Sequence, residues 1–135
     1  MSTKAHALRI IAGQYRGRSF NVPDVEGLRP TPNRVRERLF NWLQQEIVGS
    51  RCLDLYAGSG ALGLEALSRG ASTALLVDSH LLVIKHLKQL KTQWQLGDAL
   101  HIVHQTAEAF INGAQDAPFD VIFLDPPFSH RVLPL

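Results

Sequence analysis

The segment that most limits how this 135-residue chain can fold is a glycine-rich loop between an apolar run and a helical pattern. Its spacing is Gly58-x-Gly60-x-x-Gly63, and it begins three residues after the short, mostly apolar run 52–55. Glycines at such a turn let the chain reverse tightly and let a ligand approach the backbone, with helix N–H groups pointing at it. The order predicts a strand, a loop and a helix, with a ligand at the loop.

Three more short apolar runs follow, and helical patterns separate them. Buried parallel strands give runs of this kind, and their alternation with helices indicates an open α/β sheet with right-handed crossovers. We expect strands at 52–55, 74–77, 101–103 and 121–124, and helices at 60–69, 80–95 and 107–112. We therefore predict an α/β, Rossmann-like sheet of about four parallel strands that binds ligands at the carboxyl ends of its strands.

The N-terminal residues have a different pattern. Residues 8–22 alternate loosely around Gly13 and Gly17, which predicts a β-hairpin with arginines on its exposed face. A loop then leads to Thr31 as the expected N-cap of a helix, with Pro32 at its first position. We expect 1–49 to form this N-terminal unit and 50–135 to form the sheet.

The helix after Pro32 has apolar residues at helical spacing, which predicts one buried face and one basic face. The expected buried residues are Val35, Leu39, Trp42, Leu43 and Ile47, and the opposite face carries Arg34, Arg38 and Asn41. Trp94 is also expected in the core.

The net charge of +2 is unevenly distributed. Residues 1–38 carry a net charge of +5, so the remainder carries −3. The first part would attract a polyanion such as nucleic acid, although a solvated basic surface is an equal alternative.

Two acidic residues suggest which ligand the glycine loop receives. Asp54 lies in the strand end before the loop, where its carboxylate would repel a pyrophosphate but suits a ligand with an ammonium group. S-adenosylmethionine carries an ammonium and a sulfonium and no phosphate. Asp78 ends the second strand, where an acidic side chain can accept both ribose hydroxyls. The alternative is that Asp54 and Asp78 are loop residues that face water and bind no ligand. Tyr56 either packs on the ligand or only on the loop.

The fourth strand runs into Asp125-Pro126-Pro127-Phe128. Methyl transfer to an exocyclic amine needs two acceptors that free and aim the nitrogen lone pair, and the Asp125 carboxylate and Pro126 carbonyl suit this task. Consecutive prolines hold those acceptors rigidly, and Phe128 can stack on an extruded base. A rigid exit loop without chemistry is the alternative.

With both loops in place, the chain resembles the bacterial 16S rRNA guanine-N2 methyltransferase family that modifies guanine 966. The resemblance spans roughly 8–128. It is carried by Arg9-Ile10-Ile11-Ala12-Gly13-Gln14-Tyr15-Arg16-Gly17-Arg18, by Gly27-Leu28-Arg29-Pro30-Thr31-Pro32-Asn33-Arg34-Val35-Arg36-Glu37 with Leu39-Phe40-Asn41-Trp42-Leu43, and by residues 53–71.

The resemblance implies a class I S-adenosylmethionine-dependent methyltransferase sheet, with the hairpin and basic helix on RNA in the 30S subunit or its assembly intermediate. The implied catalytic residues are Asp125, Pro126, Pro127 and Phe128. The implied cofactor-binding residues are Asp54, Tyr56, Gly58, Gly60, Asp78, Thr106 and Ala107. The implied RNA-binding residues are Arg16, Arg18, Arg29, Arg34 and Arg38.

The chain departs from the family pattern in three respects. Asn33 and Arg38 make its helix more basic, and Thr106 stands where an Asp or Asn commonly holds the adenine amino group. Family members continue through three further strands, whereas this chain ends ten residues after Asp125, so we expect a truncated product or fragment whose fourth strand is an exposed edge.

Other functions remain as alternatives: another amino-methyltransferase such as one for adenine N6, an inactive RNA-binding remnant, or a nicotinamide-dependent oxidoreductase. Glu65 is equally compatible with a solvent-facing, helix-packing or catalytic role. The histidines lack metal-binding spacing, so no metal is expected. The chain has no apolar run long enough for a bilayer, no secretory signal pattern and a single cysteine, so we expect a cytoplasmic protein.

Overall fold

The computed structural model describes residues 7–25, 28, 32–113 and 118–126, and within them the chain forms an α/β fold. Four parallel strands make one sheet in the order β5-β4-β3-β6. They are β3 (Arg51–Asp54), β4 (Thr73–Asp78), β5 (Leu100–His104) and β6 (Val121–Phe123). All four lie where the apolar runs predict them.

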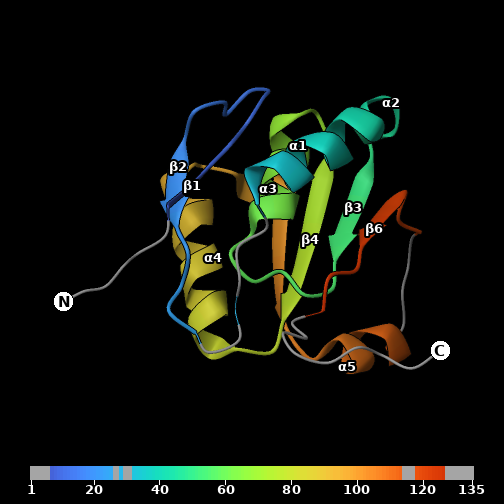
Figure 1. Cartoon of the computed structure of the whole chain (residues 1–135). Coiled ribbons are helices and arrows are strands. Elements are labelled where there is room, and N and C mark those ends of the chain that lie inside the picture. The colour runs from blue at the N-terminus through green and yellow to red at the C-terminus, as the bar shows by residue number, and fades with distance from the viewer. Residues whose placement is uncertain (1–6, 26–27, 29–31, 114–117, 127–135) are drawn as a thin grey trace.

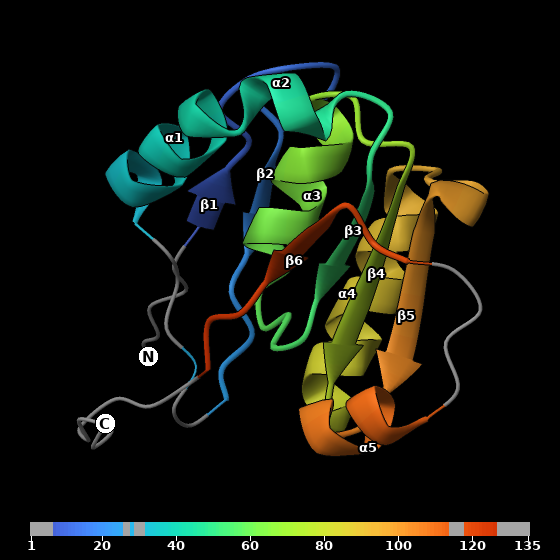
Figure 2. The same ribbon diagram turned by 90° about the vertical axis from the view of Figure 1, so that its right-hand side faces the viewer.

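Helices cover both faces of this sheet (Figures 1 and 2). They are α3 (Ala61–Ser68), α4 (Leu81–Gln93) and α5 (Ala107–Asn112), with a short 3₁₀ turn, η1, at Gly97–Ala99. The first two pack on one face within the main apolar cluster, and α5 packs on the other face within a second, smaller cluster. The predicted α/β, Rossmann-like class is confirmed.

The strand order places a topological switch point between β3 and β6. The chain moves from β3 outward through β4 to β5, and then returns to the opposite side of β3 to form β6. In open α/β sheets, the carboxyl ends of the strands at such a switch point are where ligands bind. The loops that follow β3 and β6 are the ones that the sequence singles out.

The N-terminal hairpin is also confirmed. Strands β1 (Ala7–Arg9) and β2 (Ser19–Asn21) pair antiparallel, and they lie on the outer side of α3 and α4 (Figure 1). Phe20 is buried there, with its ring centroid 5.8 Å from that of Trp94 at the end of α4. Trp94 is thus in the core, as predicted.

The predicted single helix after Pro32 is wrong in two details. It divides at Leu43 into α1 (Asn33–Trp42) and α2 (Gln44–Ile47). Pro32 has φ −57° and ψ 146°, which makes it the N-cap and not the first helical residue. Thr31, the expected cap, lies outside the described residues.

The buried face of α1 also differs from the prediction. Val35 and Trp42 are 53% and 82% exposed, whereas Arg36 and Phe40 are fully buried. The ring of Phe40 lies 5.6 Å from that of Phe123 on β6, and Arg36 pairs with Glu65 of α3. These two contacts fix the rotation of α1. The apolar period of the sequence does not reveal the second, because both of its residues are charged.

The fourth strand lies at the edge of the described sheet, as expected, because β6 pairs with β3 alone. Its Ile122 and the following Leu124 are 55% and 64% exposed. No helix in the described ranges has the length and apolar character to cross a bilayer. The same ranges contain no cluster of three His, Cys, Asp or Glu side chains that could hold a metal ion.

Candidate active site at the ends of strands β3, β4 and β6

Three carboxylates meet at one edge of the sheet because the register of the parallel strands brings them there. Asp54, the last residue of β3, aligns with Leu76 on β4 and with Phe123 on β6. Asp78 and Asp125 each lie two residues beyond those partners, Asp78 as the last residue of β4 and Asp125 just past the end of β6. The acids that the sequence assigns to cofactor and to catalysis therefore lie at the carboxyl ends of neighbouring strands, on one edge of the sheet.

Asp54 is the most perturbed of the three acids. It is 2% exposed, and burial raises its pKa to about 7. A hydrogen bond from the Tyr56 N–H, 3.1 Å from Oδ1, opposes this shift, whereas the charges of Asp125 and Asp78 add to it. Asp125 follows β6, whose Phe123 is aligned with Asp54, so its charge adds to the effect of burial on the Asp54 pKa. A cation placed among these acids would be strongly favoured.

Asp78 holds the glycine loop closed against the sheet. One of its carboxylate oxygens accepts the Gly58 N–H at 3.0 Å, and the other accepts the His80 N–H at 2.9 Å. Gly58 and Gly60 have φ values of +55° and +91°, in the region that favours glycine. Gly60 is also the N-cap of α3, so that helix begins at this loop, where the Ala61 N–H donates to Ser59 Oγ at 3.3 Å.

His86 also supports the loop, and the sequence gives no sign of this role. Its Nε2 donates to the Ser59 carbonyl at 2.8 Å, and burial lowers the pKa of its imidazole, so the neutral ring is favoured. Because histidine on a helix has many uses, only the fold identifies this one. Gly63, in the first turn of α3, allows that helix to pack closely on the sheet, because an added Cβ would lie 2.5 Å from Leu76 on β4.

The remaining predicted cofactor residues have local roles in the structure. Tyr56 is half-buried, and its backbone N–H is the group that contacts Asp54. The Thr106 Oγ1 accepts the Ala109 N–H at 3.0 Å and so caps α5. Ala107 is 5% exposed, within the smaller apolar cluster. Cofactor contacts by these three residues stay predictions.

At the end of β6, Asp125 is exposed and Pro126 is half-buried, so the acidic side chain is open to a substrate. Pro127 and Phe128 lie outside the described residues. The structure thus brings together the ends of β3 and β6, which the sequence predicts to carry cofactor binding and catalysis. Phe128, the residue proposed to stack on the base, is not among the described residues.

The basic residues assigned to RNA lie on the hairpin and on α1. Arg16, Arg34 and Arg38 are exposed. Arg18 is exposed too, with its guanidinium 4.9 Å from the Tyr15 ring centroid and 5.5 Å from that of Trp94. Arg29 lies outside the described residues.

Comparison with known proteins identifies the family. The family described as conserved hypothetical protein 95 matches residues 8–134. The chain belongs to this family. The Ribosomal RNA small subunit methyltransferase D of Escherichia coli strain K12 is 48% identical over 126 residues, which are 93% of this chain and 63% of that protein. Its Haemophilus influenzae namesake is 47% identical over 90% of this chain and 64% of that protein. The resemblance inferred from the sequence is confirmed.

Comparison with solved structures also shows similarity to methyltransferases. The Escherichia coli protein yhhF superposes with a TM-score of 0.83 at 46% identity, over 95% of this chain and 68% of that one. The C-terminal domain of precorrin-6Y C5,15-methyltransferase from Rhodobacter capsulatus is 19% identical, with a TM-score of 0.60 over 75% of this chain and 53% of that one. The latter likeness concerns the fold alone, which is that of class I methyltransferases. The chain spans slightly less than two thirds of the length of the two curated relatives named above.

Proposed function

We propose that this chain transfers a methyl group from S-adenosylmethionine to the exocyclic N2 amine of a guanine in 16S rRNA. The observation that carries the proposal is the meeting of Asp54, Asp78 and Asp125 at the switch point of the sheet. The names of the two curated relatives, which specify a ribosomal RNA methyltransferase, support the same reaction and substrate.

The residues around the glycine loop fit this cofactor. Among the described residues, no Lys or Arg pairs with the three carboxylates, and the one basic side chain near them is that of His80, whose Nδ1 lies 3.5 Å from Asp78. Such a site favours a cationic ligand over the pyrophosphate of a dinucleotide. Asp54 would hold the ammonium group, Asp78 would accept the ribose hydroxyls, and the Gly58–Gly60 backbone would line the cofactor. When bound, the cofactor supplies an electrophilic sulfonium methyl group.

The end of β6 would present the amine. The Asp125 carboxylate and the Pro126 carbonyl are acceptors, and each would receive one amine N–H, which leaves the nitrogen lone pair directed at the methyl group. Acceptors at the end of a paired strand need little reorganisation during the reaction. Pro127 would restrict this backbone and Phe128 would stack on the base, as the sequence predicts.

The N-terminal elements would bind the RNA. Exposed arginines from two elements, Arg16 and Arg18 on the hairpin and Arg34 and Arg38 on α1, offer positive charge to phosphates, and Arg29 is predicted to join them. The substrate would be 16S rRNA within the 30S subunit or its assembly intermediate.

The variant Asp125→Ala tests the reaction. Transfer of labelled methyl to 30S subunits that lack the modification should fall by about 100- to 1,000-fold, while calorimetry shows nearly unchanged affinity for S-adenosylmethionine. Asp98→Ala, which removes an exposed carboxylate from η1, is the matched control.

Each alternative function gives its own result in this experiment. An active Asp125→Ala variant would refute the catalytic assignment. Tight binding of NAD in place of S-adenosylmethionine would indicate an oxidoreductase. RNA binding without transfer by the wild-type chain would indicate an inactive remnant. Mass spectrometry of the product nucleosides separates guanine N2 from adenine N6.

A further inference from the structure

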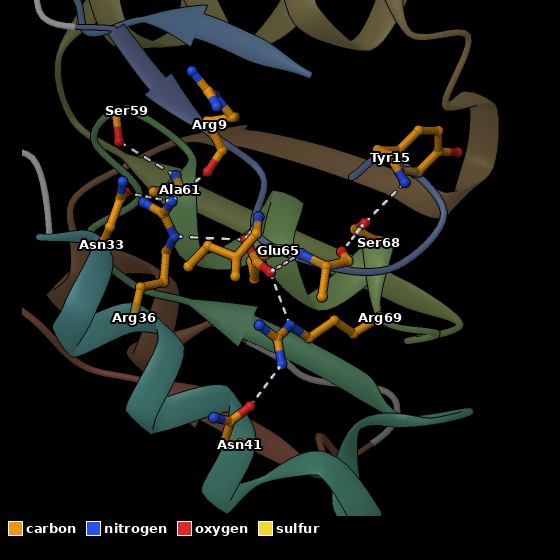
Figure 3. A network of polar contacts seen from close by, with 12 residues as sticks. Arg9, Tyr15, Asn33, Arg36, Asn41, Ser59, Ala61, Glu65, Ser68 and Arg69 are labelled. Atoms are coloured by element: carbon orange, nitrogen blue, oxygen red, sulfur yellow. Dashed lines mark hydrogen bonds and ion pairs between the residues drawn. The ribbon is translucent and has the colours of Figure 1, made fainter. Parts of the chain in front are cut away.

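The carboxylate of Glu65 is fully buried and binds four groups from three parts of the chain (Figure 3). It accepts the backbone N–H groups of Ile11 and Ala12 in the hairpin turn, at 3.0 and 3.2 Å. It also pairs with Arg36 Nε of α1 at 3.6 Å and with Arg69 Nε, just after α3, at 2.8 Å. The sequence alone does not distinguish this role from helix packing.

The partners of Glu65 extend the connection to both basic elements. Arg36 donates through Nη2 to the Arg9 carbonyl on β1 and to Asn33 Oδ1 at the start of α1. Arg69 reaches Asn41 Oδ1 near the end of α1, at 3.4 Å. One buried carboxylate therefore links the hairpin and α1, the two elements with the exposed arginines, to α3.

Ser68 makes a second set of contacts between α3 and the hairpin turn. Its hydroxyl accepts the Tyr15 N–H at 2.9 Å and donates to the Ala12 carbonyl at 2.6 Å, while its own carbonyl accepts the Gln14 N–H at 2.8 Å. Gly13 sits so close that an added Cβ would lie 2.0 Å from the Ser68 carbonyl oxygen. The turn therefore rests directly on the last turn of α3.

The other end of α3 starts at the cofactor loop, because Gly60 is its N-cap. The helix is eight residues long and fully buried, so it connects the two ends as a short rigid element. Glu65 itself lies more than one turn from Gly60, and within the described residues its carboxylate binds groups of the N-terminal elements and Arg69.

We propose that Glu65 is a positioning residue for the RNA substrate, because its carboxylate fixes the arginines of the hairpin relative to the cofactor loop. This inference rests on the proposed function and deepens it. With Glu65 intact, Arg16 and Arg18 occupy one position from which the rRNA is aligned with the methyl donor. Without the charge of Glu65, the hairpin turn no longer holds that position, and the two arginines contribute little to RNA binding.

A double-mutant cycle in the full chain tests this proposal. The changes are Glu65→Gln and the pair Arg16→Ala with Arg18→Ala, and the measurements are the Kd for unmodified 30S subunits and the Kd for S-adenosylmethionine. In the wild-type background, loss of the two arginines should weaken RNA binding about tenfold. In the Glu65→Gln background the same loss should cost less than about twofold, because the contributions are coupled. Cofactor affinity should stay the same in all four proteins.

A Glu65→Gln change that only loosened the fold would leave the effect of the two arginines unaltered. Additive effects in the cycle would therefore overturn the positioning role, even if the wild-type chain binds cofactor and methylates RNA. A wild-type chain that binds cofactor but no 30S subunits would instead overturn the proposed function and this inference with it.

Two glycine variants keep the test decisive if Glu65→Gln does not fold. Gly13 and Gly17 have φ values of +94° and +85°, so alanine meets the same backbone strain at both. Only Gly13 contacts Ser68, whereas nothing lies within 4 Å of a Cβ added at Gly17. In the Gly13→Ala background, loss of Arg16 and Arg18 should weaken RNA binding by less than about twofold, as in the Glu65→Gln background. In the Gly17→Ala background, the same loss should weaken RNA binding about tenfold, as in the wild type. Equal behaviour of the two variants would overturn the proposal.

Discussion

Replacing Asp54 with asparagine should stabilise the chain without ligand, even though it removes a proposed binding residue. The side chain keeps its size, and its amide oxygen can still accept the Tyr56 N–H. It no longer places a negative charge in a position that is 2% exposed and next to Asp125 and Asp78. The expected gain is stability at neutral and alkaline pH.

The size and pH range of the gain follow from the pKa of Asp54, which burial raises from an ordinary 3.8 to about 7. Below the ordinary value the carboxyl group is neutral in both the folded and the unfolded chain. As the pH rises to about 7, only the unfolded chain loses the proton, so folding becomes less favourable; above that range the cost is constant. At 1.36 kcal/mol per pKa unit, the advantage of Asp54→Asn should be roughly 3 kcal/mol larger at pH 8 than at pH 5.

Urea unfolding at pH 5, 6, 7 and 8, followed by the fluorescence of the buried Trp94, measures this difference. Asp98→Asn on η1 is the control, because it removes one carboxylate that is exposed. If the free energies of unfolding of wild type and Asp54→Asn differ by the same amount at all four pH values, the Asp54 charge is not desolvated in the folded chain. Destabilisation of the variant at pH 8 would refute the reasoning outright.

Two further results are expected. In calorimetry, the wild-type affinity for S-adenosylmethionine should fall about tenfold from pH 8 to pH 6, because protonation of Asp54 near pH 7 removes the charge that holds the ammonium group. The affinity of Asp54→Asn should be weak and nearly constant over that range. Gly63→Ala should destabilise the chain by about 1–3 kcal/mol in urea, because the new methyl group would meet Leu76 on β4; unchanged stability would show that α3 can shift on the sheet without cost.

Much of the fold could be predicted because its causes are local in the sequence. Apolar runs alternate with helical periods, so the four strands and the helices α3, α4 and α5 lie near their expected positions. The approach of Asp54 to Asp125 was also predictable, since the ends of parallel strands on either side of a switch point share one crevice.

The rotation of α1 could not be predicted in the same way. Its periodicity favours Val35 and Trp42 as buried residues, yet the structure buries Arg36 instead. An arginine is buried only where a partner compensates its charge, and here the partner is Glu65, which lies 29 positions later in the chain. Hydropathy describes each residue by itself and contains no information about such a pair.

The sequence by itself determined the α/β class, the strand ends that carry the acids, and the glycine loop, because these depend on periodicity and on the conformations open to each residue. Tertiary structure alone decided which face of α1 is buried, that His86 supports the Ser59 carbonyl, and that Glu65 joins the hairpin to α3. These features arise from polar groups distant in the sequence that pair with each other away from water, and such pairings exist only once the chain has folded.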